Sequence, residues 1–229
     1  GKNVDGGSSS SSSSSNGSSN VSSQVISLNG DQGNTTSTNT GSTTATSDCG
    51  GFSDVSGNSS YCEAIDWVQS ADIFQGYSDG KFKPFKAINR VEVLKVILEA
   101  MNVSQSNASG NLGFKDVQIG AWYMPYIAAA KNLGIFSGDA GKGTARPDDT
   151  VNRAELLKFV FETLKAADGH NMATCKSNYS DAGSQWCSNY ACEAKRYSLY
   201  DGSSLYPAAL STRGEVAEVL YRLHKVGAL

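Results

Sequence analysis

The strongest constraint on this sequence is a pattern that occurs three times along the chain. Each copy opens with an aromatic residue two positions before an aspartate, continues through a glycine-rich loop with a proline, and ends in Asn/Thr-Arg-x-Glu. The arginines of the last motif, Arg90, Arg153 and Arg213, are 63 and 60 residues apart, and the loop prolines have the same spacing. Landmarks that share one period indicate an internal repeat, and such repeats bury their apolar faces against one another.

Each repeat predicts a short helix, a loop and a longer helix. The longer segments carry apolar residues at spacings near 3.6, and each opens with a capping box, in which Asn or Thr precedes Glu by three positions. We therefore predict an all-α fold in which the three longer helices converge on a shared core. The short helices are expected at 61–73, 122–133 and 187–199, and the longer helices directly after Asn89, Asn152 and Thr212.

Composition divides the chain into a tail and a foldable part. Residues 1–48 contain 16 Ser, 7 Thr, 7 Gly, 6 Asn and no aromatic residue, so they cannot bury enough apolar surface to offset their conformational entropy. All 21 aromatic residues and all five cysteines lie in residues 49–229. We expect a low-complexity extended tail or linker over 1–48, followed by repeats at 49–108, 109–172 and 173–229.

The repeated arginine occupies an unfavourable position. A cation in the first turn of a helix opposes the macrodipole at a cost of roughly 0.3–1 kcal/mol, so each arginine is expected to have a partner. One candidate is an external anion held jointly by the guanidinium and the helix N-terminus. The other is an internal ion pair with a repeated carboxylate, such as Asp54, Asp116 or Asp181.

Together these motifs resemble the S-layer homology (SLH) repeat, which anchors bacterial surface proteins. The resemblance covers about residues 52–226 and rests on Phe-Ser-Asp-Val at 52–55, Gly-Tyr-Ser-Asp-Gly-Lys-Phe-Lys-Pro at 76–84 and Arg-Ala-Glu at 153–155. It implies a pseudo-threefold arrangement of three helix-loop-helix units around a central three-helix bundle. It also implies a non-catalytic protein that binds a secondary cell-wall polysaccharide, often pyruvylated, in grooves between the repeats.

The resemblance further implies where the polysaccharide binds. A pyruvyl carboxylate would supply the anion that the arginines require, which favours a ligand over an internal ion pair. Repeat 3 has a shorter loop and Gly214 near a helix start, so we expect grooves that involve it not to bind. The predicted location is extracellular, at the bacterial cell wall or S-layer. The predicted polysaccharide-binding residues are Arg90, Arg153, Arg213, Asp54, Asp116, Asp79, Gly76 and Tyr77.

The five cysteines indicate an oxidising compartment. Cys49 and Cys62 are 13 residues apart, Cys175 and Cys187 are 12 apart, and each pair brackets the start of a repeat. We therefore predict two homologous disulfides, Cys49–Cys62 and Cys175–Cys187. A Cys175–Cys192 pairing stays open, and either choice leaves one thiol. A zinc site is the weaker interpretation because the sequence has no CxxC pair.

Other classes of function are disfavoured. A formal net charge of −3 provides no general attraction to nucleic acid or anionic membranes, and no apolar run reaches the length of a membrane span. The sequence has no nucleophile elbow, phosphate loop or pair of catalytic carboxylates, so we expect no enzymatic activity, cofactor or metal. Trp67, Trp122 and Trp186 could stack on sugar rings, but we favour core positions for them.

A second hypothesis concerns the tail. Its only apolar cluster lies at Val25, Ile26 and Leu28, and the extended segment 21–30 could dock on a neighbouring subunit. Such a head-to-tail contact builds filaments rather than closed rings. The alternative function is therefore a structural subunit of a self-assembling extracellular filament or S-layer, glycosylated along its Ser/Thr-rich tail.

Overall fold

The structure is a computed structural model that describes residues 48–105, 110–139, 141–172, 174–175 and 178–229. Over these ranges the chain forms six α-helices and one 3-10 turn, with isolated β-bridges and no strand. The predicted all-α class is confirmed. The predicted tail, with its apolar segment 21–30, lies outside the described residues except for Asp48.

Short and long helices alternate along the chain, as the repeat predicts. No helix in the described ranges is both long enough and apolar enough to cross a bilayer. A 3-10 turn, η1 (Cys49–Gly51), precedes the first helix. The short helices are α1 (Cys62–Ser70), α3 (Met124–Asn132) and α5 (Ser188–Arg196), and the long helices are α2 (Arg90–Ala100), α4 (Arg153–Asp168) and α6 (Arg213–Lys225).

Each long helix starts at the predicted capping box. In α2 the Asn89 side chain accepts the Glu92 N–H at 2.9 Å, and the Glu92 carboxylate accepts the Asn89 N–H at 3.2 Å. Asn152 with Glu155 and Thr212 with Glu215 form the same reciprocal pair. Local side-chain chemistry therefore determines where all three helices begin.

The short helices end before their apolar pattern does. In each repeat a residue just past the helix adopts a left-handed backbone: Asp72, Gly134 and Ser198 have φ of 57°, 73° and 53°. The next N–H then reaches back to the last turn, as Ile73 does to the Val68 carbonyl at 2.9 Å. This is the hydrogen bond of a Schellman cap, and it stops the helix while the following apolar residue still packs in the core.

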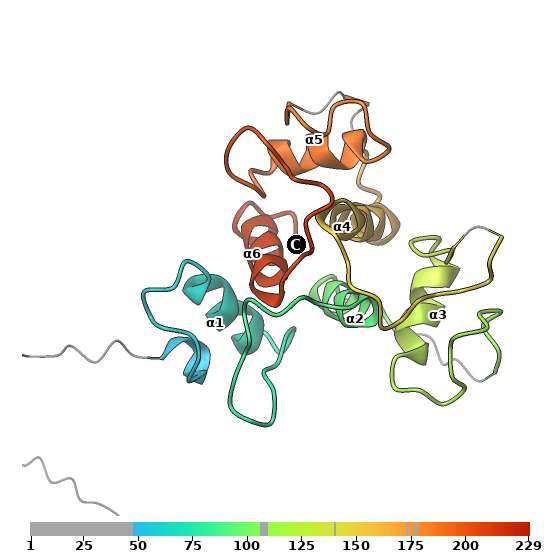
Figure 1. Ribbon diagram of the computed structural model, residues 1–229, viewed down its shortest axis with the longest axis horizontal. Coiled ribbons are helices and arrows are strands. Elements are labelled where there is room, and N and C mark those ends of the chain that lie inside the picture. Colours follow the sequence, from blue (N-terminus) through green and yellow to red (C-terminus); the bar gives the residue numbers. More distant parts are fainter. Residues whose placement is uncertain (1–47, 106–109, 140, 173, 176–177) are drawn as a thin grey trace, which may run out of the picture. The chain divides into compact units, whose positions relative to one another are not determined.

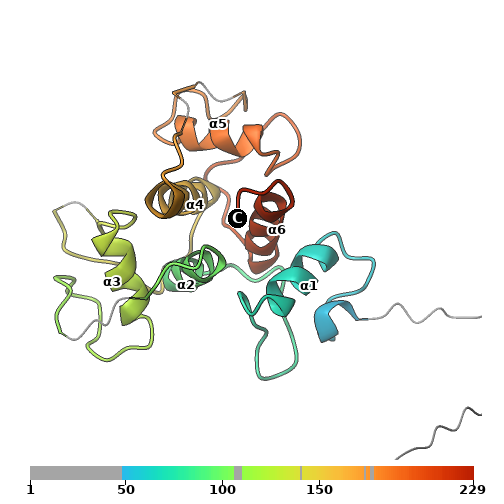
Figure 2. The ribbon, with the colours of Figure 1, turned by 180° about the vertical axis from the view of Figure 1, so that it is seen from behind.

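The long helices lie at the centre of the described part and the short helices lie outside them (Figure 1). Helix α2 packs against both α4 and α6. Each short helix packs on the long helix of the preceding repeat, so that α3 lies on α2, α5 on α4 and α1 on α6 (Figure 2). This cyclic exchange was not predicted from the sequence, and exact pseudo-threefold symmetry stays a prediction.

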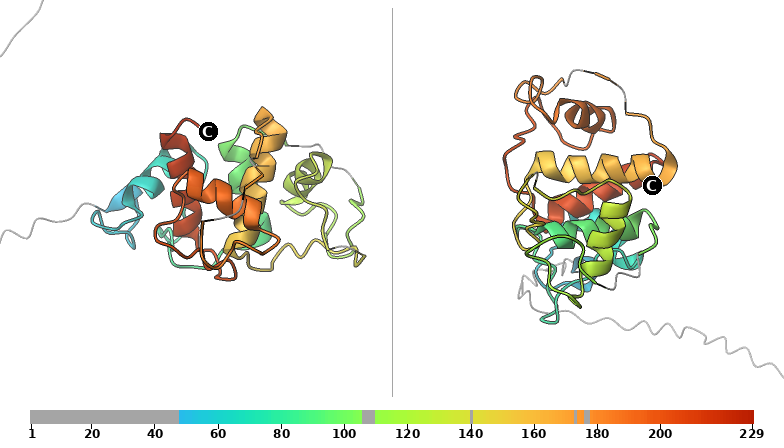
Figure 3. Two further views of the ribbon diagram at one scale, coloured as in Figure 1. Left: turned by 90° about the horizontal axis from the view of Figure 1, so that it is seen from above. Right: turned by 90° about the vertical axis from the view of Figure 1, so that its right-hand side faces the viewer.

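The apolar faces of the long helices form one core, as the periodicity predicts. The views in Figure 3 show these helices next to one another. Their inward residues expose at most 1% of their surface, and include Leu94, Ile97, Leu98, Leu156, Leu157, Val160, Phe161, Val216, Leu220 and Leu223.

The start of each long helix is bound to the loop of the next repeat. The N–H groups of Arg90 and Val91 donate to the Asp149 and Pro147 carbonyls at 3.0 and 3.3 Å. A helix leaves its first amides without intrahelical partners, and here another repeat supplies them. The equivalent bonds run from Arg153 and Ala154 to Ala209 and Pro207, and from Arg213 and Gly214 to Lys86 and Pro84. The three repeats are therefore joined in a ring.

Two disulfides cross-link the outer segments of the fold. Cys49–Cys62 ties η1 to α1 as predicted, with 5.4 Å between the Cα atoms. The predicted Cys175–Cys187 bond is wrong, because Cys175 pairs with Cys192 within α5. Cys187 precedes α5 and is fully buried, and its burial raises the pKa of the thiol.

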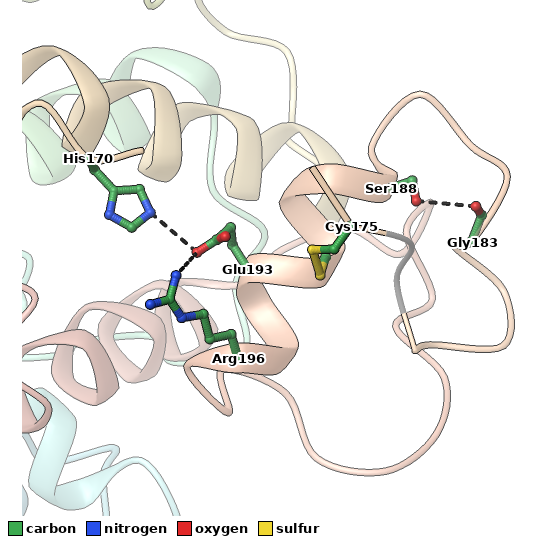
Figure 4. The surroundings of a disulfide bond; sticks show 7 residues. His170, Cys175, Gly183, Ser188, Glu193 and Arg196 are labelled. Atoms are coloured by element: carbon green, nitrogen blue, oxygen red, sulfur yellow. Dashed lines mark hydrogen bonds and ion pairs between the residues drawn. A yellow bond between two sulfur atoms is a disulfide. The ribbon is translucent and has the colours of Figure 1, made fainter. Parts of the chain in front are cut away.

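The segment before α5 is also held by a buried carboxylate. Figure 4 shows Glu193 between two basic side chains, with His170 Nε2 at 3.2 Å and Arg196 Nη1 at 3.6 Å. Cys175 lies nearby on the same connecting segment. The disulfide and this cluster together attach the segment between α4 and α5 to α5 itself.

Gly138 and Gly141 share a left-handed backbone conformation, with φ of 71° and 73°, but differ in their surroundings. Alanine substitutions at the two positions therefore distinguish the cost of a steric clash from the cost of the backbone conformation. A Cβ on Gly138 would lie 2.5 Å from both Phe114 Cε1 and the Thr144 carbonyl oxygen, whereas a Cβ on Gly141 would meet nothing within 4 Å.

We predict that Gly141→Ala costs about 1 kcal/mol of unfolding free energy, from the left-handed backbone alone. Gly138→Ala should cost a further 1–3 kcal/mol or so, because the methyl group displaces Phe114 and the loop. Urea unfolding followed by circular dichroism measures both. Equal losses in the two variants would contradict the observed packing around Gly138.

Candidate functional site

The aspartate that opens each repeat holds the loop of its own repeat. Asp54 accepts the N–H groups of Phe82 and Lys83, both at 2.8 Å. Asp116 does the same for Ala145 and Arg146, and Asp181 for Leu205 and Tyr206. No salt bridge in the described ranges joins these aspartates to the repeated arginines, so the aspartates named as internal partners are wrong. The alternative itself, an ion pair with a repeated carboxylate, is confirmed for Arg90 and Arg153. A direct role for Asp54 and Asp116 in polysaccharide binding stays a prediction.

The first two arginines pair instead with the capping-box glutamate of the next repeat. Arg90 donates from Nη1 to Glu155 at 3.0 Å and from Nε to the Ala145 carbonyl at 3.2 Å. Arg153 Nε and Nη2 both donate to Glu215, and its Nη1 donates to the Leu205 carbonyl at 2.9 Å. The glutamate offsets the cost of a cation in the first helical turn.

Arg213 is enclosed by the loop of repeat 1. It donates from Nε to the Phe82 carbonyl at 2.7 Å and from Nη2 to the Gln75 carbonyl at 2.8 Å. The rings of Phe74, Tyr77 and Phe82 lie 4.1, 4.5 and 4.8 Å from its guanidinium carbon. Only 4% of the residue is exposed, and this burial lowers its pKa. Cation–π contacts stabilise the enclosed charge.

The helix N-termini do not offer free amides to an anion. The first two N–H groups of each long helix donate to the next loop, and the third donates to the cap side chain. The expectation of joint binding by a guanidinium and a helix N-terminus is therefore wrong. An anion would have to bind to cationic side chains.

Two hollows lie beside the first two arginines. The first, which we call the Arg90 groove, has a volume of about 270 Å³. A shallower hollow shares Asp139 and Arg146 with it and adds Lys142. Four cations thus face two carboxylates in this region. The polar and aromatic residues that define the Arg90 groove are Arg90, Asp139, Arg146, Glu155, Lys158 and Trp186.

The second hollow, which we call the Arg153 cleft, has a volume of about 300 Å³. Like the Arg90 groove, it draws residues from all three repeats. Both hollows thus involve repeat 3, for which the sequence predicted no binding. Nothing in the structure tests that prediction, and we depart from it for both hollows below. The Arg153 cleft is defined by Tyr61, Arg153, Tyr200, Asp201, Glu215, Glu218 and Arg222.

Of the predicted loop residues of repeat 1, Tyr77 lies against Arg213, and none of them lines either hollow. Tyr77 covers the guanidinium and receives a hydrogen bond from Lys86 Nζ at 3.0 Å. Gly76 leaves space for Phe52, whose ring carbon would lie 2.2 Å from a Cβ. Asp79 is exposed and pairs with Lys83 at 2.9 Å. Their proposed contacts with polysaccharide remain predictions.

Of the six residues that define the Arg90 groove, the sequence predicted only Arg90 as a binding residue. Arg146 precedes the loop proline and Lys158 lies three residues after the capping-box glutamate, but the residue type at each position changes between the repeats, so no shared motif identifies them. Trp186 was expected in the core, but it is 61% exposed, and Trp122 is 57% exposed. In the structure each lies two residues before its short helix, although Trp122 opens the predicted helix 122–133. Among the described residues, no group of three His, Cys, Asp or Glu side chains could hold a metal ion.

Comparison with known proteins identifies the repeats. Residues 51–94 and 113–157 match the S-layer homology domain. The chain is 30% identical over 167 residues to the exoglucanase XynX of Acetivibrio thermocellus, covering 70% of this chain and 15% of that protein. It is 30% identical over 168 residues to the surface-layer 125 kDa protein of Lysinibacillus sphaericus, covering 70% and 14%. A cellulosome-anchoring protein of A. thermocellus is 26% identical over 167 residues, covering 70% and 37%.

The chain therefore belongs to the S-layer homology family. It spans well under half the length of these relatives, some of which are enzymes and others surface proteins. The family and its surface-layer members indicate a location at the bacterial cell surface or cell wall. The third repeat extends beyond the two matched segments, and the equivalent hydrogen bonds at Asp181 and Arg213 support it.

Asp181 should make stability dependent on pH. Burial alone would raise its pKa, but the N–H groups of Leu205 and Tyr206 outweigh that effect and hold the pKa below its ordinary value. The contribution of Asp181 to stability is therefore present above pH 3.8 and is lost as the pH falls through the lowered pKa.

We predict that Asp181→Asn lowers the free energy of unfolding at pH 7. The difference in stability between the variant and the wild-type protein should shrink between pH 4 and about pH 2. Thermal unfolding across that range measures it. Asp66→Asn, which removes an exposed carboxylate from α1, is the control for net charge. A difference that stays constant with pH would contradict the role of the Asp181 carboxylate.

Proposed function

We propose that this protein is a non-catalytic anchor that binds an anionic, pyruvylated secondary cell-wall polysaccharide without covalent attachment. The observation that carries the proposal is the excess of cations in and beside the Arg90 groove. Arg90, Lys142, Arg146 and Lys158 surround a space in which Asp139 and Glu155 are the only carboxylates among the described lining residues. Arg90 already pairs with Glu155, and Arg146 pairs with Asp139 and Asp149. The cations without a salt bridge among the described residues are Lys142 and Lys158, and a carboxylate on a sugar would pair with them.

Arg90 can pair with a ligand without leaving its internal partners. Its described side-chain bonds use Nε and one hydrogen of Nη1, so Nη2 is available to donate. The Phe136 and Phe159 rings lie 5.2 and 5.3 Å from the guanidinium carbon and hold its plane. A pre-oriented guanidinium loses little entropy on binding a carboxylate.

Trp186 supplies a surface for the sugar ring itself. Its side chain lines the Arg90 groove and is mostly exposed. An exposed aromatic face beside a cationic pocket suits a sugar that carries an acidic substituent, because the ring packs on the apolar face of the sugar while the acid group reaches the cations.

The filament hypothesis stays a prediction, since its docking segment lies outside the described residues.

We predict that the protein co-sediments with purified cell-wall sacculi and that Arg146→Gln with Lys158→Gln lowers its affinity about fivefold or more. The matched control is Lys165→Gln, which removes an exposed cation from the same helix, α4, outside the groove. Mild acid treatment of the sacculi, which cleaves pyruvyl ketals, should abolish binding of the wild-type protein.

Two results would contradict the proposal. One is a protein that stays in the supernatant with untreated sacculi. The other is equal pelleting of the wild-type protein and the double variant. Release of soluble sugars from the sacculi would show a catalytic activity instead of an anchor.

A further inference from the structure

The Arg153 cleft differs in charge from the Arg90 groove. It continues into a larger hollow of about 640 Å³ along α6, and the two hollows share Ser60, Glu218 and Arg222. Together they are lined by three cations and four carboxylates, whereas four cations face two carboxylates around the Arg90 groove. The carboxylates are Glu63, Asp201, Glu215 and Glu218, and the cations are Arg153, Arg222 and Lys225.

The arginines in the Arg153 cleft already have carboxylate partners. Arg153 pairs with Glu215, and Arg222 donates to Glu218 at 2.6 Å and to Asp201 at 3.1 Å. Lys225 lies 4.0 Å from Glu63, so all three cations here have a carboxylate partner. Beside the Arg90 groove, by contrast, Lys142 and Lys158 form no salt bridge among the described residues. An additional anion in the Arg153 cleft would therefore compete with its carboxylates. Asp201 is 85% exposed and keeps free lone pairs for another donor.

The walls of the cleft are rich in tyrosine. Tyr61, Tyr200 and Tyr206 line the Arg153 cleft itself, and Tyr197 and Tyr221 line the continuation along α6. The Tyr200 hydroxyl is buried and has no hydrogen-bond partner among the described residues. Tyrosine faces and carboxylates together form a favourable surface for an ammonium group on a sugar ring.

One position carries opposite charges in the two hollows. Glu218 lies three residues after the capping-box Glu215, and Lys158 lies three residues after the capping-box Glu155. Glu218 lines both parts of the Arg153 cleft, and Lys158 lines the Arg90 groove. Lys95 occupies the same position in repeat 1, where it pairs with Glu99 at 2.8 Å.

We propose that the Arg153 cleft and its continuation along α6 bind a stretch of glycan whose sugars carry free amines. Glu218 and Lys158 then set opposite charge preferences in the two hollows. This inference rests on the proposed function in that the ligand is a glycan, but it assigns a different sugar chemistry to a different site.

The test is isothermal titration of the whole chain with three tetrasaccharides: glucosamine, N-acetylglucosamine and galacturonic acid tetramers. We expect the glucosamine tetramer to bind more tightly than the N-acetylated one. Glu218→Gln should weaken the glucosamine tetramer about fivefold and leave the galacturonic acid tetramer unchanged. Lys158→Gln should do the reverse.

Lys95→Gln is the matched control, because it also removes one member of an i,i+4 ion pair at the equivalent position. It should leave all three affinities unchanged. Glu218→Lys extends the series, and circular dichroism checks that each variant folds. In Glu218→Lys the preference of the cleft should shift from the amine to the acid.

The outcomes separate this inference from the proposed function. Binding of the glucosamine tetramer that depends on Glu218, without any binding of galacturonic acid, supports the inference while the anionic site fails. Equal or tighter binding of the N-acetylated or galacturonic acid tetramer at the Glu218-dependent site overturns the inference. Unchanged affinities in Glu218→Gln overturn it as well.

Discussion

The structure depends on one interaction, in which the loop of each repeat completes the first helical turn of the repeat before it. Loop carbonyls accept the N–H groups that begin each long helix, and the aspartate that opens a repeat holds that loop in place. Because repeat 1 supplies these groups to repeat 3, the contacts form a closed ring. No repeat can satisfy its own long helix, so the repeats are expected to fold together.

The same contact creates the functional surfaces. It brings the arginine of one repeat against the glutamate and loop of the next, which places Arg90 and Arg153 at the edges of open hollows. At the third junction, Tyr77 and two phenylalanines enclose Arg213. One backbone arrangement thus supports three junctions of different chemistry. The side chains that line the hollows, such as Lys158 and Glu218, determine what each can bind.

Local features of this fold could be predicted from the sequence, and relations between repeats could not. Capping boxes and apolar spacing are properties of neighbouring residues, so the helix starts and the core were predicted. The partner of Arg90 is Glu155, 65 residues away, and it already has a local role in its own capping box. Spacing alone also paired Cys187 with Cys175. In the structure Cys187, the residue before α5, is a buried free thiol, and Cys175 is bonded to Cys192 instead.

The closed ring can be tested most directly with one tryptophan in each repeat. Trp67, Trp122 and Trp186 belong to repeats 1, 2 and 3, so three variants that each keep a single tryptophan report on the repeats separately. Urea unfolding followed by their fluorescence should show one transition, with the same midpoint as circular dichroism of each variant. A fluorescence midpoint that differs from the circular dichroism midpoint of the same variant would contradict the account, because it would show that the repeat carrying that tryptophan unfolds separately from its neighbours.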